Sequence, residues 1–207
     1  GNPVREALVE AAAAAQYNYN GERPLRLLVL GGSLGAKPIN DALPGVVRRL
    51  LRGRRVDPTE VWHQTGDAHA QTVIKSYGDL ISDTVRVVPF IEDMAAAYAW
   101  ADVVICRAGA LTVSELAVMG RPSVLVPLPH AIDDHQTANA RSLADRGGAI
   151  LLPQSDMTED ALIIALRAYM EHPERLRTMA EAARKAAAPE ATQQVADEVE
   201  ALIDAAR

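Results

Sequence analysis

The segment ADVVICRAGALTVSELAVMG, residues 101–120, joins a short apolar run to a helical pattern through a glycine. The run at 102–107 is rich in β-branched residues and apolar between its ends, which is typical of a strand buried on both faces of a parallel sheet. Residues 111–119, which follow Gly109, have helical spacing. The segment therefore predicts a strand that runs directly into a helix, the repeating unit of an α/β fold.

The same alternation continues on both sides of this segment. Further apolar runs predict strands at 25–30, 59–64, 85–90, 123–128 and 148–153. Patterns between them predict helices near 36–51, 67–78, 93–101, 134–146 and 158–171. From Pro173 the chain reads as helix throughout, and we expect residues 189–207 to form a C-terminal helix. These patterns predict a Rossmann-like α/β fold: a parallel sheet of about six strands with flanking helices and a helical C-terminal tail.

All 207 residues are expected to form one domain, because no second domain begins within them and no internal repeat is present. Residues 11–24, AAAAAQYNYNGERP, end in turn-forming residues before the first strand, and we expect this stretch to be the most flexible. The chain begins with Gly1 rather than methionine, so we expect it to be a piece of a longer protein or a processed product.

Composition and charge exclude several classes of protein. The formal net charge of -6 argues against non-specific attraction to nucleic acid or to anionic lipid. Cys106 is the single cysteine, which excludes an internal disulfide and a cysteine-rich metal site. We find no signal peptide and no run of about 18 apolar residues, so we expect a cytoplasmic protein without a membrane span.

The first loop after a predicted strand is glycine-rich: GGSLGAKPIN, residues 31–40. Gly31 and Gly32 permit close approach of a ligand to the backbone, and Ser33 offers a hydroxyl, so a phosphate would fit. A tight turn with Ser33 as the helix N-cap explains the same residues equally well. The loop lacks the G-x-G-x-x-G spacing of dinucleotide-binding proteins and the lysine of a P-loop, which disfavours NAD and ATP.

The loop within residues 101–120 also has two interpretations. Thr112 and Glu115 have the spacing of a capping box, in which Thr112 caps the helix and Glu115 reaches back to its amide. Alternatively, the free amides around Ala110, Leu111 and Thr112 hold a diphosphate. Glu115, one turn further on the same face, would then accept hydrogen bonds from a vicinal diol such as that of a ribose.

Two further loops hold candidate site residues. In PLPHAIDDHQTANA, residues 127–140, Gln136 and Asn139 share a helix face and either read sugar hydroxyls or belong to a capped surface helix. This loop also contains side chains of metal-ligand type: His130, Asp133, Asp134 and His135. Their spacing does not demand a metal, and we expect none. In VPFIEDMAAAY, residues 88–98, the side chains of Phe90, Ile91 and Met94 form either an apolar slot for a base or part of the core.

The order and spacing of these blocks resemble the C-terminal half of the MurG family, the bacterial N-acetylglucosaminyltransferases that make the lipid-linked peptidoglycan precursor lipid II. The matching blocks are GNPVR at 1–5, GGSLGA at 31–36, HQTG at 63–66, PFIEDMAAAYAWADVVICRAGALTVSEL at 89–116 and DDHQTANA at 133–140. The resemblance implies the nucleotide-sugar half of a two-domain glycosyltransferase of the GT-B type. Leu34 stands where the family often has glutamine, so we assign no polar role there.

The resemblance also implies contacts with UDP-GlcNAc. Backbone atoms of Ile91 would read the uracil edge, with Phe90 and Met94 beside the base, and Glu115 would bind the ribose diol. The implied contacts to the diphosphate come from Ser33 and the amides of Leu111 and Thr112, with Arg5 neutralising charge near the sugar phosphate. The implied sugar contacts come from Ala110 and Gln136, with His135 at a sugar-side position.

The reaction implied by the resemblance moves GlcNAc from UDP-GlcNAc to the C4 hydroxyl of the muramoyl sugar of lipid I, with inversion. It needs no cofactor, and we identify no general base in this chain. The acceptor-binding N-terminal half is expected to be absent from these 207 residues, so the chain alone is expected to be inactive. The whole enzyme would be peripheral on the cytoplasmic face of the membrane. One alternative is a non-catalytic UDP-sugar-binding module. The other is half of a UDP-GlcNAc 2-epimerase, and the GGSLGA and DDHQTANA blocks disfavour this second alternative.

Overall fold

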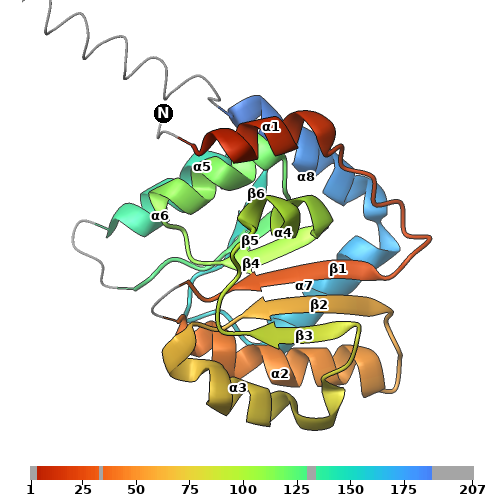
Figure 1. Ribbon diagram of the computed structural model, residues 1–207. Helices are drawn as coiled ribbons and strands as arrows, with labels where there is room; N and C mark the ends of the chain where they lie inside the picture. Colours follow the sequence, from red (N-terminus) through yellow and green to blue (C-terminus); the bar gives the residue numbers. More distant parts are fainter. Residues whose placement is uncertain (1–3, 33–34, 130–133, 188–207) are drawn as a thin grey trace, which may run out of the picture.

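A single parallel sheet forms the centre of the protein (Figure 1). The computed structural model describes residues 4–32, 35–129 and 134–187. The strands are β1 (Leu25–Leu30), β2 (Thr59–Gln64), β3 (Val85–Val88), β4 (Val103–Cys106), β5 (Ser123–Leu125) and β6 (Ala149–Leu151). Their order is β3-β2-β1-β4-β5-β6, which confirms the predicted parallel sheet. Because the strand order reverses between β1 and β4, the carboxyl ends of these two strands form the topological switch point.

Helices cover both faces of the sheet (Figure 1). They are α1 (Glu6–Ala14), α2 (Lys37–Arg52), α3 (Ala70–Tyr77), α4 (Met94–Trp100), α5 (Ala110–Met119), α6 (His135–Ala144), α7 (Glu159–Glu171) and α8 (Pro173–Ala186), with short 3₁₀ turns at Asp67–His69 and Gly78–Leu80. Successive residues of β1 point to opposite faces. Leu27 and Val29 pack with α2, α3 and α7, whereas Leu28 and Leu30 pack with α1, α4, α5 and α6. The sheet is therefore buried on both faces, as its apolar runs predict.

The predicted strands and helices are confirmed within a few residues at their ends, but the N-terminal segment differs from expectation. The prediction of flexibility over 11–24 is wrong for residues 11–14, which belong to α1. The irregular residues that follow are anchored, because Tyr19 is buried and Arg23 forms a two-pronged ion pair with Asp102 at 2.7 and 2.8 Å. The predicted helix over 189–207 lies outside the described residues.

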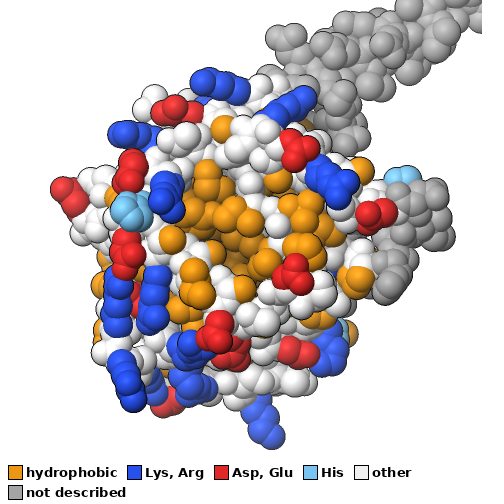
Figure 2. Space-filling view, turned by 180° about the vertical axis from the view of Figure 1, so that it is seen from behind, with side chains coloured by type: hydrophobic (Ala, Val, Ile, Leu, Met, Phe, Trp, Pro, Cys, Tyr) orange, Lys and Arg blue, Asp and Glu red, His pale blue; other side chains and the backbone are white. Residues whose placement is uncertain are grey.

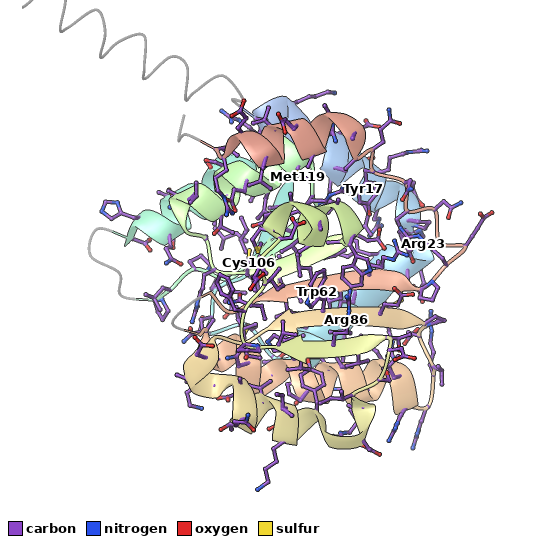
Figure 3. All side chains as sticks on the ribbon, in the orientation of Figure 1. Tyr17, Arg23, Trp62, Arg86, Cys106 and Met119 are labelled. Atoms are coloured by element: carbon purple, nitrogen blue, oxygen red, sulfur yellow. The ribbon has the colours of Figure 1, made fainter. Side chains whose placement is uncertain are left out.

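Polar and aromatic contacts brace the sheet at points away from the carboxyl ends (Figure 3). The Arg86 guanidinium lies 4.1 Å from the centre of the Trp62 ring, and Trp62 meets Trp100 edge to face. Met119 is fully buried at the end of α5. In the part of the chain that the structure describes, no helix combines the length and the apolar character needed to cross a membrane.

The opposite face of the protein has an apolar hollow near its centre (Figure 2). Acidic and basic side chains are mixed around the hollow, so charge of one sign does not dominate this view. The candidate functional site is instead defined by a cleft at the switch point of the sheet.

Candidate functional site

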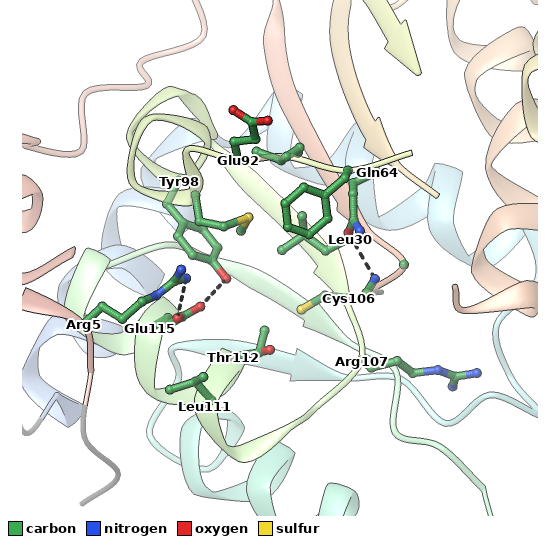
Figure 4. A pocket seen from close by; sticks show the side chains of 15 residues that line it. Arg5, Leu30, Gln64, Glu92, Tyr98, Cys106, Arg107, Leu111, Thr112 and Glu115 are labelled. Carbon is green, nitrogen blue, oxygen red and sulfur yellow. Dashed lines mark hydrogen bonds and ion pairs between the residues drawn. The ribbon is translucent and has the colours of Figure 1, made fainter. Parts of the chain in front are cut away.

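A cleft of about 420 Å³ opens at the carboxyl ends of β1, β2 and β4 (Figure 4). It lies at the switch point, which is where open parallel sheets bind their ligands. Its lining residues come from the strand ends, the segment after β3, the first turns of α5 and the N-terminal segment: Arg5, Leu30, Gly31, Gly32, Gln64, Phe90, Ile91, Glu92, Met94, Tyr98, Cys106, Arg107, Leu111, Thr112 and Glu115. Seven of the eleven residues predicted from the sequence are therefore brought together in one cleft.

Glu115 is the acidic residue of α5; it lies in the second turn of the helix and is 4% exposed. Arg5 Nη2 donates to its Oε1 at 2.9 Å, and the Tyr98 hydroxyl donates to its Oε2 at 3.1 Å (Figure 4). The predicted capping box is wrong. Helix α5 begins at Ala110 with Gly109 as N-cap, so Thr112 is already the third helical residue and its side chain does not cap. The carboxylate of Glu115 is thus directed toward the cleft and not toward the helix start.

The N-terminus of α5 faces the same cleft. Leu111 and Thr112 line it, and Ala110 begins the helix beside them. The amides of these three residues have no carbonyl partner within the helix, because the first turn lacks preceding carbonyls. They carry the positive end of the helix dipole, a favourable position for an anion. The cleft therefore combines anion-binding amides with a carboxylate one turn away.

The glycine loop forms the wall on the other side. Gly32 has a φ of +73°, which other residues rarely adopt, and a Cβ on Gly31 would lie 2.9 Å from the Gln64 carbonyl oxygen. Gln64 accepts a hydrogen bond from the Gly32 amide at 3.1 Å and donates one to the Pro89 carbonyl at 3.4 Å. Sequence reasoning missed this glutamine, although a polar residue at the end of a buried strand was a usable signal. Ser33 and Leu34 lie outside the described residues.

The segment after β3 supplies the apolar part of the cleft. Ile91 is 4% exposed, Met94 is half-buried, and Phe90 is 60% exposed. Asp93 fixes the end of this segment, because its side chain accepts a hydrogen bond from the Ala96 amide at 2.9 Å and caps α4. Phe90, Ile91 and Met94 all line the cleft, and Ile91 also belongs to the core on this face of the sheet, so a slot for a base stays a prediction.

A buried polar network lies under the glycine loop. The two ring nitrogens of His63 lie 2.9 Å from Asn40 Oδ1 and 3.0 Å from the Tyr77 hydroxyl. The Asn40 amide nitrogen donates to the Thr65 carbonyl, so its oxygen faces His63 and we infer that Nε2 carries the proton. Burial lowers the pKa of His63 to about 3, which keeps the imidazole neutral. In the cleft floor, burial and then the Glu115 charge raise the pKa of Cys106 to about 12, so its thiol stays uncharged.

Arg107 also lines the cleft, and sequence reasoning missed it. Its guanidinium donates to the carbonyls of Val126 and Pro127 at 3.2 and 3.0 Å and to Gln154 Oε1 at 2.7 Å. Burial lowers the pKa of Arg107 from its ordinary value. The signal was weak, because an arginine after a strand more often points to solvent.

The residues predicted at the start of α6 do not line the cleft. His135 is exposed, and the Gln136 side-chain oxygen accepts a hydrogen bond from the Leu128 amide at 2.9 Å. Asn139 donates to the Ala108 carbonyl at 3.0 Å. Asp134 is the N-cap residue of α6, has a φ of +50° and makes no side-chain capping bond. Asp133 and His130 lie outside the described residues, and the described residues contain no cluster of three or more ligands suited to a metal.

A family model and curated relatives both match this chain over most of its length. The sequence pattern of the glycosyltransferase family 28 C-terminal domain matches residues 26–195. A relative from Tolumonas auensis, the UDP-N-acetylglucosamine--N-acetylmuramyl-(pentapeptide) pyrophosphoryl-undecaprenol N-acetylglucosamine transferase, is 46% identical over 203 residues. That alignment covers 98% of this chain and 56% of the relative. The chain thus spans about half the length of the curated relatives it matches.

Solved structures resemble this chain at two levels of sequence identity, one high and one low. The crystal structure of Acinetobacter baumannii MurG matches with a TM-score of 0.78 and 42% identity, over 91% of this chain and 54% of that one. The UDP-GlcNAc 2-epimerase from Neisseria meningitidis bound to UDP-GlcNAc matches with a TM-score of 0.56 and 15% identity, over 95% of this chain and 47% of that one. At that identity the likeness to the epimerase shows the fold alone.

Proposed function

The chain belongs to the glycosyltransferase family 28 C-terminal domain family, and from this premise we propose that it is the UDP-GlcNAc-binding domain of a lipid I N-acetylglucosaminyltransferase. The observation that carries the proposal is the position of Glu115, one turn inside the helix whose N-terminal amides face the same cleft. A volume of about 420 Å³ falls within the range of small-molecule sites. Relatives named for this transfer support the substrate assignment.

The uridine would lie between the apolar segment and α5. Phe90 and Met94 would contact the uracil, and the backbone of Ile91 would read its edge. Each oxygen of the Glu115 carboxylate keeps acceptor capacity beyond its bond to Arg5 or Tyr98, because a carboxylate offers about four acceptor sites. It can therefore take the two hydroxyls of a ribose, one on each oxygen.

The diphosphate would lie at the N-terminus of α5, against the amides of Leu111 and Thr112, with Ser33 approaching from the glycine loop. Arg5 stands at the cleft mouth with 57% of its side chain exposed, so its charge is available to the phosphate nearest the sugar. As the bond between the sugar and UDP breaks, negative charge grows on the departing UDP. The amides, which the helix holds in fixed positions, and the positive charge of Arg5 stabilise that negative charge, which lowers the barrier to transfer.

The sugar would extend toward the start of α6, near Ala110, His135 and Gln136. The Gln136 oxygen is occupied by the Leu128 amide, so its NH₂ group is the part of the side chain that can donate to a sugar hydroxyl. Residues 1–207 would act as one donor domain, with 189–207 as its C-terminal helix. The lipid I acceptor and the general base would be held by an N-terminal domain of the whole enzyme, working at the cytoplasmic face of the membrane.

Calorimetric titration of the chain with UDP, UDP-GlcNAc, NAD and ATP tests the donor assignment. We expect binding of the two uridine ligands and none of the other two, and tighter binding of NAD than of UDP would refute it. The transfer assignment needs a second assay, with a lipid I analogue as acceptor. The chain alone should give no appreciable GlcNAc transfer, and addition of the N-terminal half of a relative should restore it. Robust turnover by the chain alone would contradict the division of roles.

A further inference from the structure

Tyr98 is a buried residue in the cleft wall that no motif singles out. It lies on α4, is 1% exposed, and its hydroxyl is the donor to Glu115 Oε2 at 3.1 Å (Figure 4). Helix α4 begins directly after the apolar segment that contains Ile91. The hydrogen bond therefore joins the element beside the proposed base site to the carboxylate of the proposed ribose site.

The two donors to Glu115 differ in how firmly they are held. Arg5 precedes α1 and exposes 57% of its side chain, so its bond to Oε1 is open to water and to an incoming phosphate. Tyr98 has two side-chain torsions and belongs to the buried core on this face of the sheet, together with Val4, Leu8 and Leu116. Its hydroxyl position is consequently set by the fold, whereas that of the Arg5 guanidinium is not.

We propose that Tyr98 is a positioning residue for nucleotide recognition, whose hydroxyl holds the Glu115 carboxylate in the orientation that accepts a ribose diol. The inference rests on the proposed function. A glutamate side chain has three torsions, and ordering them on binding would cost affinity. The hydroxyl of Tyr98 fixes the carboxylate through Oε2 before the ligand arrives, and the remaining acceptor sites then face the cleft.

The electrostatics of this pair favour a permanent donor. Burial, and then the charge of Glu115, raise the pKa of Tyr98 well above its ordinary value. The groups that face the hydroxyl include the carboxylate of Glu115, the thiol of Cys106 and the guanidinium of Arg5. The phenol therefore stays protonated and donates its hydrogen bond to Glu115 throughout the pH range of an assay.

Tyr98→Phe tests the inference, because phenylalanine keeps the buried ring and removes only the donor. Tyr77→Phe is the matched control: Tyr77 is equally buried, but its hydroxyl contacts His63 under the glycine loop. Each variant is titrated by calorimetry with UDP and with 2',3'-dideoxy-UDP, and its thermal unfolding is recorded. Binding of the dideoxy ligand itself reports that the cleft is folded.

We expect Tyr98→Phe to weaken UDP binding about three- to tenfold, the range for one lost hydrogen bond, and to leave 2',3'-dideoxy-UDP within about twofold of the wild type. Tyr77→Phe should leave the ratio of the two affinities unchanged. An equal effect of Tyr98→Phe on both ligands, or no effect on either, would overturn the inference while the donor assignment stands. Failure of the wild-type chain to bind UDP would overturn the proposed function and this inference with it.

Discussion

Acidification provides a test of the buried network under the glycine loop, because burial makes protonation of His63 unfavourable in the folded chain. The side chain is 0% exposed, and both ring nitrogens have hydrogen-bond partners, in Asn40 and Tyr77. Burial lowers its pKa from the ordinary 6.5 to about 3. Between these two values the unfolded chain binds a proton that the folded chain does not.

The sign and size of the effect follow from this difference. The contribution of neutral His63 is fully present above pH 6.5 and is lost as the pH falls toward 3. Each pH unit in that interval costs about 1.4 kcal/mol of unfolding free energy. At pH 5, about 1.5 units below the unfolded pKa, the loss from His63 alone is therefore about 2 kcal/mol.

Urea unfolding at pH 7.5 and pH 5 measures the loss. His63→Gln keeps a donor and an acceptor but does not titrate, so its unfolding free energy should fall by about 2 kcal/mol less than that of the wild type over the same interval. His172→Gln is the control for removal of an imidazole from the surface, because His172 exposes 51% of its side chain. Equal losses in the wild type and His63→Gln would refute the reasoning.

Three further predictions concern single side chains. Asp102→Ala should lower the unfolding free energy, measured by urea unfolding, by about 3 to 5 kcal/mol, because it leaves the Arg23 guanidinium without its buried partner. Asp41→Ala is the control: it removes the exposed ion pair with Lys37 and should lower the unfolding free energy by under about 1 kcal/mol. Glu115→Ala should weaken the binding of UDP by about 1.5 to 3 kcal/mol and the binding of 2',3'-dideoxy-UDP far less. If the binding of both ligands weakens equally, the role of Glu115 is structural. Gln136→Ala should narrow the preference for UDP-GlcNAc over UDP-GalNAc by about 1 to 3 kcal/mol and should change the affinity for UDP little. Competition titrations measure this preference, and an unchanged preference would exclude Gln136 from sugar selection.

The sheet was predictable because burial on both faces leaves a strong signal in the sequence. Runs such as residues 25–30 and 102–107 are apolar without alternation, and a parallel strand is the element that needs this composition. The strand ends then place the glycine loop, the segment after β3 and the start of α5 at one edge. Most of the candidate site follows from that placement alone.

Helix α1 was not predictable from local sequence, because its support comes from distant parts of the chain. Only Leu8 and Ala12 of the helix are buried, a weak pattern within an alanine-rich stretch. Its C-terminal carbonyls are satisfied by Arg184, which donates to Ala12 and Ala15 from α8 at 2.9 and 2.7 Å. A helix whose final turn depends on a residue about 170 positions away cannot be read from a local window.

The capping box at Thr112 and Glu115 was wrong for a related reason. The spacing of the two residues fits a cap, but Gly109 is the N-cap of α5, three residues before Thr112. Glu115 is then too far along the helix to reach its N-terminus and bonds instead to Tyr98 and Arg5, neither of which is adjacent in sequence. Local spacing defined the candidates, and tertiary contacts decided between them.

The contacts missed from the sequence share a physical role, which is to join separate loops at the edge of the cleft. Gln64 ties the glycine loop to the segment after β3, Arg107 ties β4 to the residues after β5, and Tyr98 ties α4 to Glu115. Groups held in this way need little reordering when a ligand binds, so a larger share of the contact energy appears as affinity. In the proposed function, the fixed amides at the start of α5 would act in the same way on the negative charge that grows during bond breaking. We therefore expect ligand recognition in this domain to depend on hydrogen bonds that never touch the ligand, and variants of these side chains should impair binding through the geometry of their neighbours.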